Sequence, residues 1–110
     1  MQYKIQESRE AIEDVTHFAT HMINEFKNPD AAASFLKRYD REILKLQTFP
    51  FGYRGISIEY RGYEIRMKIF DTYNVFFIVD ASESTIFIIR VLKDRQNWQR
   101  ILSKTESYHR

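Results

Sequence analysis

Apolar and polar residues follow two different periods in the two halves of the chain. In the first half, apolar residues recur every three to four positions, which is typical of amphipathic helices. They are Ile12, Val15, Ala19, Met22, Ile23 and Phe26 in one stretch and Ala32, Phe35, Leu36, Tyr39, Ile43 and Leu46 in the next. Ser8 is a suitable N-cap for the first helix, and Asn28-Pro29 ends it and begins the second. The pattern predicts an antiparallel helical hairpin.

After Gly52 the period becomes two, which predicts strands over residues 56–60, 63–69, 73–80 and 85–92. The last two runs are almost continuously apolar, as expected of central strands. A short strand over 3–6 and a short helix over 95–102 complete the pattern. We therefore predict one α+β domain over 1–110, with a flexible tail at 103–110. An N-terminal strand precedes a helical hairpin that packs on a four-stranded antiparallel meander, and a short C-terminal helix follows.

The register of the strands at 63–69 and 73–80 decides which residues meet the helices. If residues 70–72 form the turn, Met67 and Val75 share the core face, while Arg66 and Lys68 lie on the opposite face. A shift of one residue would instead place Val75 beside Arg66. In both registers the two basic residues point away from Met67.

Because the helices are expected to cover only one face, the other face needs a partner macromolecule to cover its apolar side chains. The residues expected to contact that partner are Asn74, Phe76, Ile78, Ile86, Ile88 and Trp98. For Trp98 a second interpretation is that the ring packs on its own sheet.

Composition narrows the class of protein. The 110 residues are 44% hydrophobic and carry a net charge of +2, with a pI of about 8.9. The absence of cysteine excludes disulfides and thiolate zinc sites and fits a reducing compartment. Acidic residues gather early and basic residues late, so an anionic partner would meet the second half. With no signal-like or membrane-spanning run, we expect a soluble, cytoplasmic protein.

His17 and His21 lie four residues apart on the first predicted helix. This spacing is compatible with zinc binding, but the glutamate of a metalloprotease helix is missing. A polar helix face is the preferred interpretation, and we expect neither a metal nor a cofactor.

Several stretches, in this order and spacing, resemble the RelE/ParE superfamily of toxins. They are the hairpin break at Asn28-Pro29-Asp30, the Phe49-Pro50 junction, the strand YNVFFIVD at 73–80 and the ending IIRVLKDRQNW at 88–98. The strand is similar to the family's "YRVFYxVD", and the ending is similar to a ParE-like "IxRVLHxRxDW". The resemblance covers roughly residues 3–102.

The resemblance implies the toxin of a bacterial type II toxin–antitoxin pair, which arrests growth when its antitoxin is degraded. Expected partners are a cognate antitoxin and a target, with a homodimer or a toxin–antitoxin hetero-oligomer as the assembly. The ending favours a ParE-like inhibitor of DNA gyrase slightly over a RelE-like endonuclease that cuts mRNA on the ribosome. A third alternative is a degenerate toxin that only binds its antitoxin.

The sequence is compatible with both an enzyme and a non-enzymatic inhibitor. If the chain is a RelE-like enzyme, the resemblance implies a metal-independent endoribonuclease. Such a nuclease needs cations that orient the phosphate and stabilise its developing charge. The candidates are Arg66, Lys68, Arg90 and Arg95. Tyr108 and His109 are further candidates for proton transfer. Asn74, which replaces the arginine of the family strand, and Asp94 depart from the nuclease pattern.

Overall fold

The computed structural model describes residues 2–105 and contains eight regular elements besides short 3₁₀ turns. In chain order they are β1 (Lys4–Glu7), α1 (Arg9–Asn24), α2 (Pro29–Leu44), β2 (Gly55–Tyr60), β3 (Tyr63–Phe70), β4 (Tyr73–Asp80), β5 (Thr85–Lys93) and α3 (Trp98–Leu102). The predicted α+β class is confirmed. The terminal helix is shorter than predicted, because residues 93–97 form a hydrogen-bonded loop before Asn97 caps it.

Both long helices begin at the caps that the sequence predicts. The Ser8 hydroxyl oxygen accepts a hydrogen bond from the Ala11 N–H at 2.9 Å and donates to the Ile89 carbonyl at 2.7 Å. The Asn28 side chain accepts from the Ala31 N–H at 3.0 Å, with Pro29 in the first turn. The second contact of Ser8 joins the start of α1 to β5, so this cap also positions the hairpin on the sheet.

The sheet has the order β1-β5-β4-β3-β2. Strands β2 to β5 form the predicted antiparallel meander, and β1 pairs in parallel with β5. The N-terminal strand therefore extends the sheet to five strands and makes it mixed. In the β2–β3 turn, Arg61 and Gly62 both have positive φ, as a two-residue hairpin with the native strand twist requires.

Each face of the sheet carries its own apolar core. Helices α1 and α2 cover the first, which we call the helix-covered face. Its buried residues from the sheet are Phe70, Tyr73, Val75, Phe77, Val79, Ile86, Ile88 and Val91. Helix α3 covers the second, the α3-covered face, together with the curled end of the sheet. Its buried residues are Tyr60, Ile65, Met67, Phe76, Ile78, Phe87, Ile89, Leu92 and Leu102.

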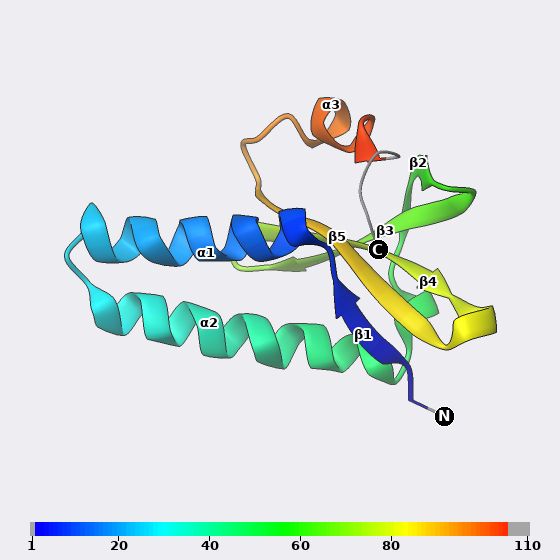
Figure 1. Ribbon diagram of the computed structural model, residues 1–110, viewed down its shortest axis with the longest axis horizontal. Helices are drawn as coiled ribbons and strands as arrows, with labels where there is room; N and C mark the ends of the chain where they lie inside the picture. The colour runs from blue at the N-terminus through cyan, green and yellow to red at the C-terminus, as the bar shows by residue number, and fades with distance from the viewer. Residues whose placement is uncertain (1, 106–110) are drawn as a thin grey trace.

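Figure 1 shows how differently the two faces are covered. Helices α1 and α2 run side by side as a long hairpin that projects beyond the sheet. Helix α3 is one short turn of chain that lies apart from them, near the end of the β2–β3 ribbon. The hairpin is thus a large element with a free tip, whereas α3 is a small lid.

Candidate functional site

The expected bare sheet face does not exist in this structure, so the expectation that it is open to a partner is wrong. Asn74, Phe76, Ile78, Ile86 and Ile88 are all buried. Ile86 and Ile88 lie under the helical hairpin, and Phe76 and Ile78 lie under the lid. The apolar runs of β4 and β5 were interpreted correctly as two-sided strands. The second cover comes from the chain's own β2 and α3 rather than from another molecule.

Trp98 packs on its own sheet, which is the second of the two interpretations given for it above. Its ring lies 5.6 Å from the ring of Phe76, and the residue is half-buried against the α3-covered face. A tryptophan at the first position of α3 therefore anchors the lid to its own sheet. Its role as a partner contact remains a prediction, limited to the part of the ring that stays exposed.

The register of β3 on β4 is the one-residue alternative, so the register assumed first is wrong. Phe70 pairs with Tyr73, and only Asp71 and Thr72 form the turn. As a result, Arg66 and Lys68 pair with Phe77 and Val75 and point to the helix-covered side. The sequence pattern did not specify whether this turn has two or three residues. With two residues, every side chain of β3 lies on the face opposite to the one assumed first.

Under the end of α2, Lys68 is enclosed by its own chain. It is 8% exposed, and its ammonium lies 3.1 Å from Glu42 Oε1 and 3.3 Å from the Tyr53 hydroxyl. Glu42 also accepts a hydrogen bond from Lys45 at 2.7 Å. The hydrogen bond from Lys45, aided by Lys68, holds the pKa of the Glu42 carboxyl below its ordinary value. Lys68 thus forms part of an internal ion-pair network.

Arg66 serves the neighbouring loop. Its guanidinium donates to the Tyr53 carbonyl at 2.7 Å and lies 5.1 Å from the centre of the Phe51 ring. Arg66 and Lys68 therefore both hold the segment around Tyr53 against β3. No local sequence pattern indicates that Tyr53 and Glu42 contact these cations, because both contacts join segments that are far apart in the chain.

Arg90 pairs with the first helix. Its Nε and Nη2 donate to the two carboxylate oxygens of Asp14, each at 2.7 Å, and the Val91 N–H donates to Asp14 at 2.9 Å. Such a two-point pair is the strongest arrangement that an arginine and a carboxylate form. Arg90 and Asp14 thus fasten α1 to β5.

Arg95 differs from the other three candidates. It is exposed in the loop between β5 and α3, and within residues 2–105 it makes no hydrogen bond or ion pair. The structure therefore brings Arg66 and Lys68 together and places Arg90 beside Asp14. Arg95 lies apart from these three, in a separate pocket. The structure does not assemble the four into one cationic cluster.

The remaining expectations concern metals and the tail. His17 and His21 stack with their ring centres 6.4 Å apart, while Asp14 is engaged by Arg90. Over residues 2–105 no group of three or more metal-ligating side chains comes together. Tyr108 and His109 lie outside the described residues, as does most of the predicted tail; of the described part, Thr105 is buried.

Sequence reasoning missed two surface features. The first is a pocket of about 380 Å³ between α1 and the loop after β5, where Lys93 and Arg95 face His17 and His21. The second is the exposed pair Phe49 and Phe51, which flank Pro50 in the segment held by Arg66. The period-two and period-3.6 patterns carry no information about either, since both arise where a loop meets another element.

Three groups on the helix-covered side have raised pKa values: the half-buried Glu7 and the buried Tyr39 and Tyr73. The Tyr39 hydroxyl donates a hydrogen bond of 3.4 Å to Glu7. Burial raises the pKa of the Glu7 carboxyl, and burial together with the nearby Glu7 charge raises the pKa of Tyr39 above its ordinary value. The hydrogen bond between Tyr39 and Glu7 joins α2 to β1. Among the described residues, none of the helices could span a lipid bilayer.

Comparison with known proteins identifies the class to which this fold and surface belong. The model of the family described as "ParE toxin of type II toxin-antitoxin system, parDE" matches residues 5–98. The chain therefore belongs to the ParE toxin family, within the RelE/ParE group of type II toxin–antitoxin toxins that the sequence resembles. A search of curated protein sequences finds no match.

Solved structures share the fold at low sequence identity. A structure of the chromosomal ParDE system from P. aeruginosa has 18% identity and a TM-score of 0.68, covering 84% of this chain and 96% of that chain. A mutant of the E. coli toxin RelE in the free state has 13% identity and a TM-score of 0.56, covering 94% and 95%. The archaeal RelE–RelB complex from Pyrococcus horikoshii has 17% identity and a TM-score of 0.53, covering 87% and 99%.

Proposed function

We propose that this toxin acts without chemistry of its own, by binding a protein target, and that the target is DNA gyrase. The observation that carries the proposal is the engagement of three of the four cations that a nuclease would need. Lys68 is held by Glu42, Arg90 by Asp14 and Arg66 by the Tyr53 carbonyl. A cation already engaged in this way is poorly placed to stabilise charge on a scissile phosphate, because its existing hydrogen bond or ion pair would have to break first.

The membership in the ParE family supports gyrase over the ribosome, in agreement with the ParE-like ending at 88–98. A binding inhibitor requires only a shaped surface. Within residues 2–105, large exposed apolar side chains lie on the hairpin and on the loop after it, including Phe26, Phe49 and Phe51. Phe26 is 68% exposed at the free tip of the hairpin. Such side chains, rather than the buried ones of β4, are the proposed contacts.

We further propose that a cognate antitoxin holds the toxin inactive, in a toxin–antitoxin hetero-oligomer. Two of the solved structures with this fold carry toxin and antitoxin names together, the ParDE system and the RelE–RelB complex. Phe49 and Phe51 are the proposed contacts of the antitoxin, because both are large apolar side chains that stay exposed in this structure. Replacing both phenylalanines by serine should weaken co-purification with the co-expressed cognate antitoxin.

The test of the target uses purified toxin in two assays, DNA supercoiling by gyrase and cleavage of mRNA on ribosomes. The proposal predicts inhibition of supercoiling and intact mRNA. Cleaved mRNA with unaffected gyrase would favour the nuclease alternative. Expression that does not slow growth would indicate a degenerate toxin and would contradict both mechanisms.

A matched pair of variants sharpens the test. Lys68→Met removes the buried partner of Glu42, and Lys45→Met removes its exposed partner. A binding inhibitor should keep its effect on gyrase in both variants, provided that thermal melting shows a folded protein. A nuclease that uses Lys68 would lose cleavage in the first variant alone.

A further inference from the structure

A pocket of about 380 Å³ lies between α1 and the loop that joins β5 to α3. Its lining residues are His17, Phe18, His21, Lys93, Arg95 and Gln96, and none of them is a carboxylate. A second pocket of about 300 Å³ shares Lys93 and Arg95 with it and adds Thr72 and Asp94. The first volume lies within the range of about 300–1,000 Å³ that is usual for small-molecule sites.

The two cations of this pocket, Lys93 and Arg95, flank Asp94 in the sequence, and Asp94 lines the adjoining pocket. The Lys93 ammonium lies 5.2 Å from the centre of the Tyr73 ring, and no carboxylate pairs with it or with Arg95 in residues 2–105. Asp14, on the neighbouring turn of α1, is already engaged by Arg90. Charge-assisted hydrogen bonds from lysine and arginine are the usual means of binding phosphate. The electrostatics therefore favour an anion.

The loop that carries these cations is held in place by its own hydrogen bonds. The Lys93 N–H donates to the Gln96 side-chain oxygen at 2.8 Å, and the Gln96 N–H donates to the Lys93 carbonyl at 3.1 Å. The Asp94 N–H donates to the Thr72 carbonyl at 3.0 Å, which ties the loop to the β3–β4 turn. A loop that is already ordered loses less entropy when a ligand binds.

The opposite wall of the pocket consists of rings. His17 and His21 stack with an angle of 23° between their planes, and Phe18 lies between them in sequence and packs on Tyr73 at 5.0 Å. Flat rings of this kind are platforms for a nucleobase, whichever base it is. The imidazole nitrogens add hydrogen-bonding groups beside the cations.

We propose that this pocket binds a free nucleotide, with the phosphate on Lys93 and Arg95 and the base against the histidine and phenylalanine rings. The inference goes beyond the proposed function, because inhibition of gyrase by surface contacts does not require a small ligand. It assigns a common site to two histidines and two cations that line one pocket.

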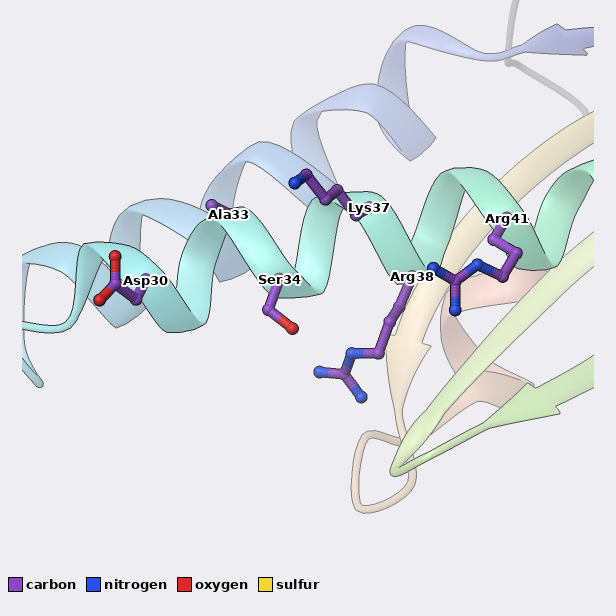
Figure 2. Close-up of a pocket in the computed structure, with 6 residues that line it drawn as sticks. All are labelled: Asp30, Ala33, Ser34, Lys37, Arg38 and Arg41. Carbon is purple, nitrogen blue, oxygen red and sulfur yellow. The ribbon is translucent and has the colours of Figure 1, made fainter.

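Another basic pocket, of about 510 Å³, is less suitable and serves as the control. Figure 2 shows that its cationic side chains, Lys37, Arg38 and Arg41, project from α2 alone, together with Asp30. Arg38 forms an ion pair with Asp71. The residues that line this pocket all come from α2; they include the carboxylate Asp30 and no aromatic side chain.

The test measures binding of adenosine monophosphate and of ribose 5-phosphate to the full chain, by calorimetry and by NMR shifts. The Lys93→Ala/Arg95→Ala variant should weaken binding of adenosine monophosphate by at least about tenfold. The Lys37→Ala/Arg41→Ala variant removes the same charge from the control pocket and should change binding by less than about twofold. Thermal melting verifies that both variants fold.

The role of the rings is tested separately. Adenosine monophosphate should bind at least about fivefold more tightly than ribose 5-phosphate, because the base adds stacking. The His17→Ala/His21→Ala variant should reduce that preference and keep the dependence on Lys93 and Arg95. Equal losses in both charge variants, equal affinity for the two probes, or binding only of a single-stranded oligonucleotide would each overturn the proposal.

Discussion

Both faces of the sheet carry a buried apolar core, but the two are covered very differently, and Ile69 of β3 on the α3-covered face stays 60% exposed. On the helix-covered face, two helices of sixteen residues each lie over the strands. On the α3-covered face, a helix of five residues and the curled β2–β3 ribbon cover the strands. The complete burial of Phe76 and Ile78 shows that a short lid is sufficient to exclude water from a two-sided strand. An apolar strand face therefore indicates burial, but it does not indicate which element provides the cover.

The largest effect is expected from opening the core of the helix-covered face. Phe35 is fully buried in α2, with its ring 4.8 Å from Tyr73 and 6.1 Å from Phe18. Phe35→Ala should lower the free energy of unfolding by about 3–5 kcal/mol, since the cavity lies between rigid elements that cannot collapse into it. Urea denaturation measures this directly, and a loss below about 1 kcal/mol would contradict the rigidity of the hairpin.

The same leucine-to-alanine substitution on each face allows a direct comparison of how firmly the two covers are held. Leu46 and Leu102 are both fully buried, Leu46 on the helix-covered face and Leu102 on the α3-covered face. Leu46→Ala should cost about 4 kcal/mol and Leu102→Ala about 2 kcal/mol, because a small lid can shift into the space left by the lost side chain. Equal losses would mean that α3 is held as firmly as the hairpin. Amide hydrogen exchange should be faster in α3 than in α2.

A smaller effect is expected from the ion-pair network under α2. Lys68→Met should change the free energy of unfolding by about 1 kcal/mol or less at neutral pH, because Glu42 keeps its hydrogen bond with Lys45 and methionine fills similar space.

The same network has a defined pH dependence. The pKa of Glu42 is lowered in the folded state, chiefly by the hydrogen bond from Lys45, so its contribution to stability is present above the ordinary value near 4.5. That contribution is lost as the pH falls through the lowered folded value. The stability difference between the native chain and Lys68→Met should therefore shrink in acid. Denaturation curves at several pH values test this, and a difference that grows in acid would contradict it.

The smallest effect concerns Glu7, at the edge where β1 meets α2. Burial raises the pKa of its carboxyl, so folding disfavours the charged form that exists at neutral pH. Its stabilising contribution is complete below the ordinary value and is lost as the pH rises through the raised folded value. Glu7→Gln should therefore stabilise the protein at neutral pH by no more than about 0.5 kcal/mol and should have no effect in acid. Thermal melting at both pH values provides the measurement.

The candidate site was much less predictable than the fold. The sequence indicated that Arg66, Lys68, Arg90 and Arg95 were cations of interest, but it contained no sign that Asp14 would pair with Arg90 across 76 positions. Long-range ion pairs depend on how elements pack, and the spacing of residues does not encode that packing. For the same reason the spacing of His17 and His21 on one helix does not predict that they line a pocket with Lys93.

The sequence by itself determined the elements, their order and the family. Helix caps at Ser8 and Asn28, the change of period after Gly52 and the two-sided apolar strands are local properties, because they depend on backbone preferences and on side-chain alternation. Only the tertiary structure decided the register of β3 on β4, the cover over Phe76 and the partners of Arg66, Lys68 and Arg90. These depend on one residue of turn length and on contacts between distant segments, which no local pattern records.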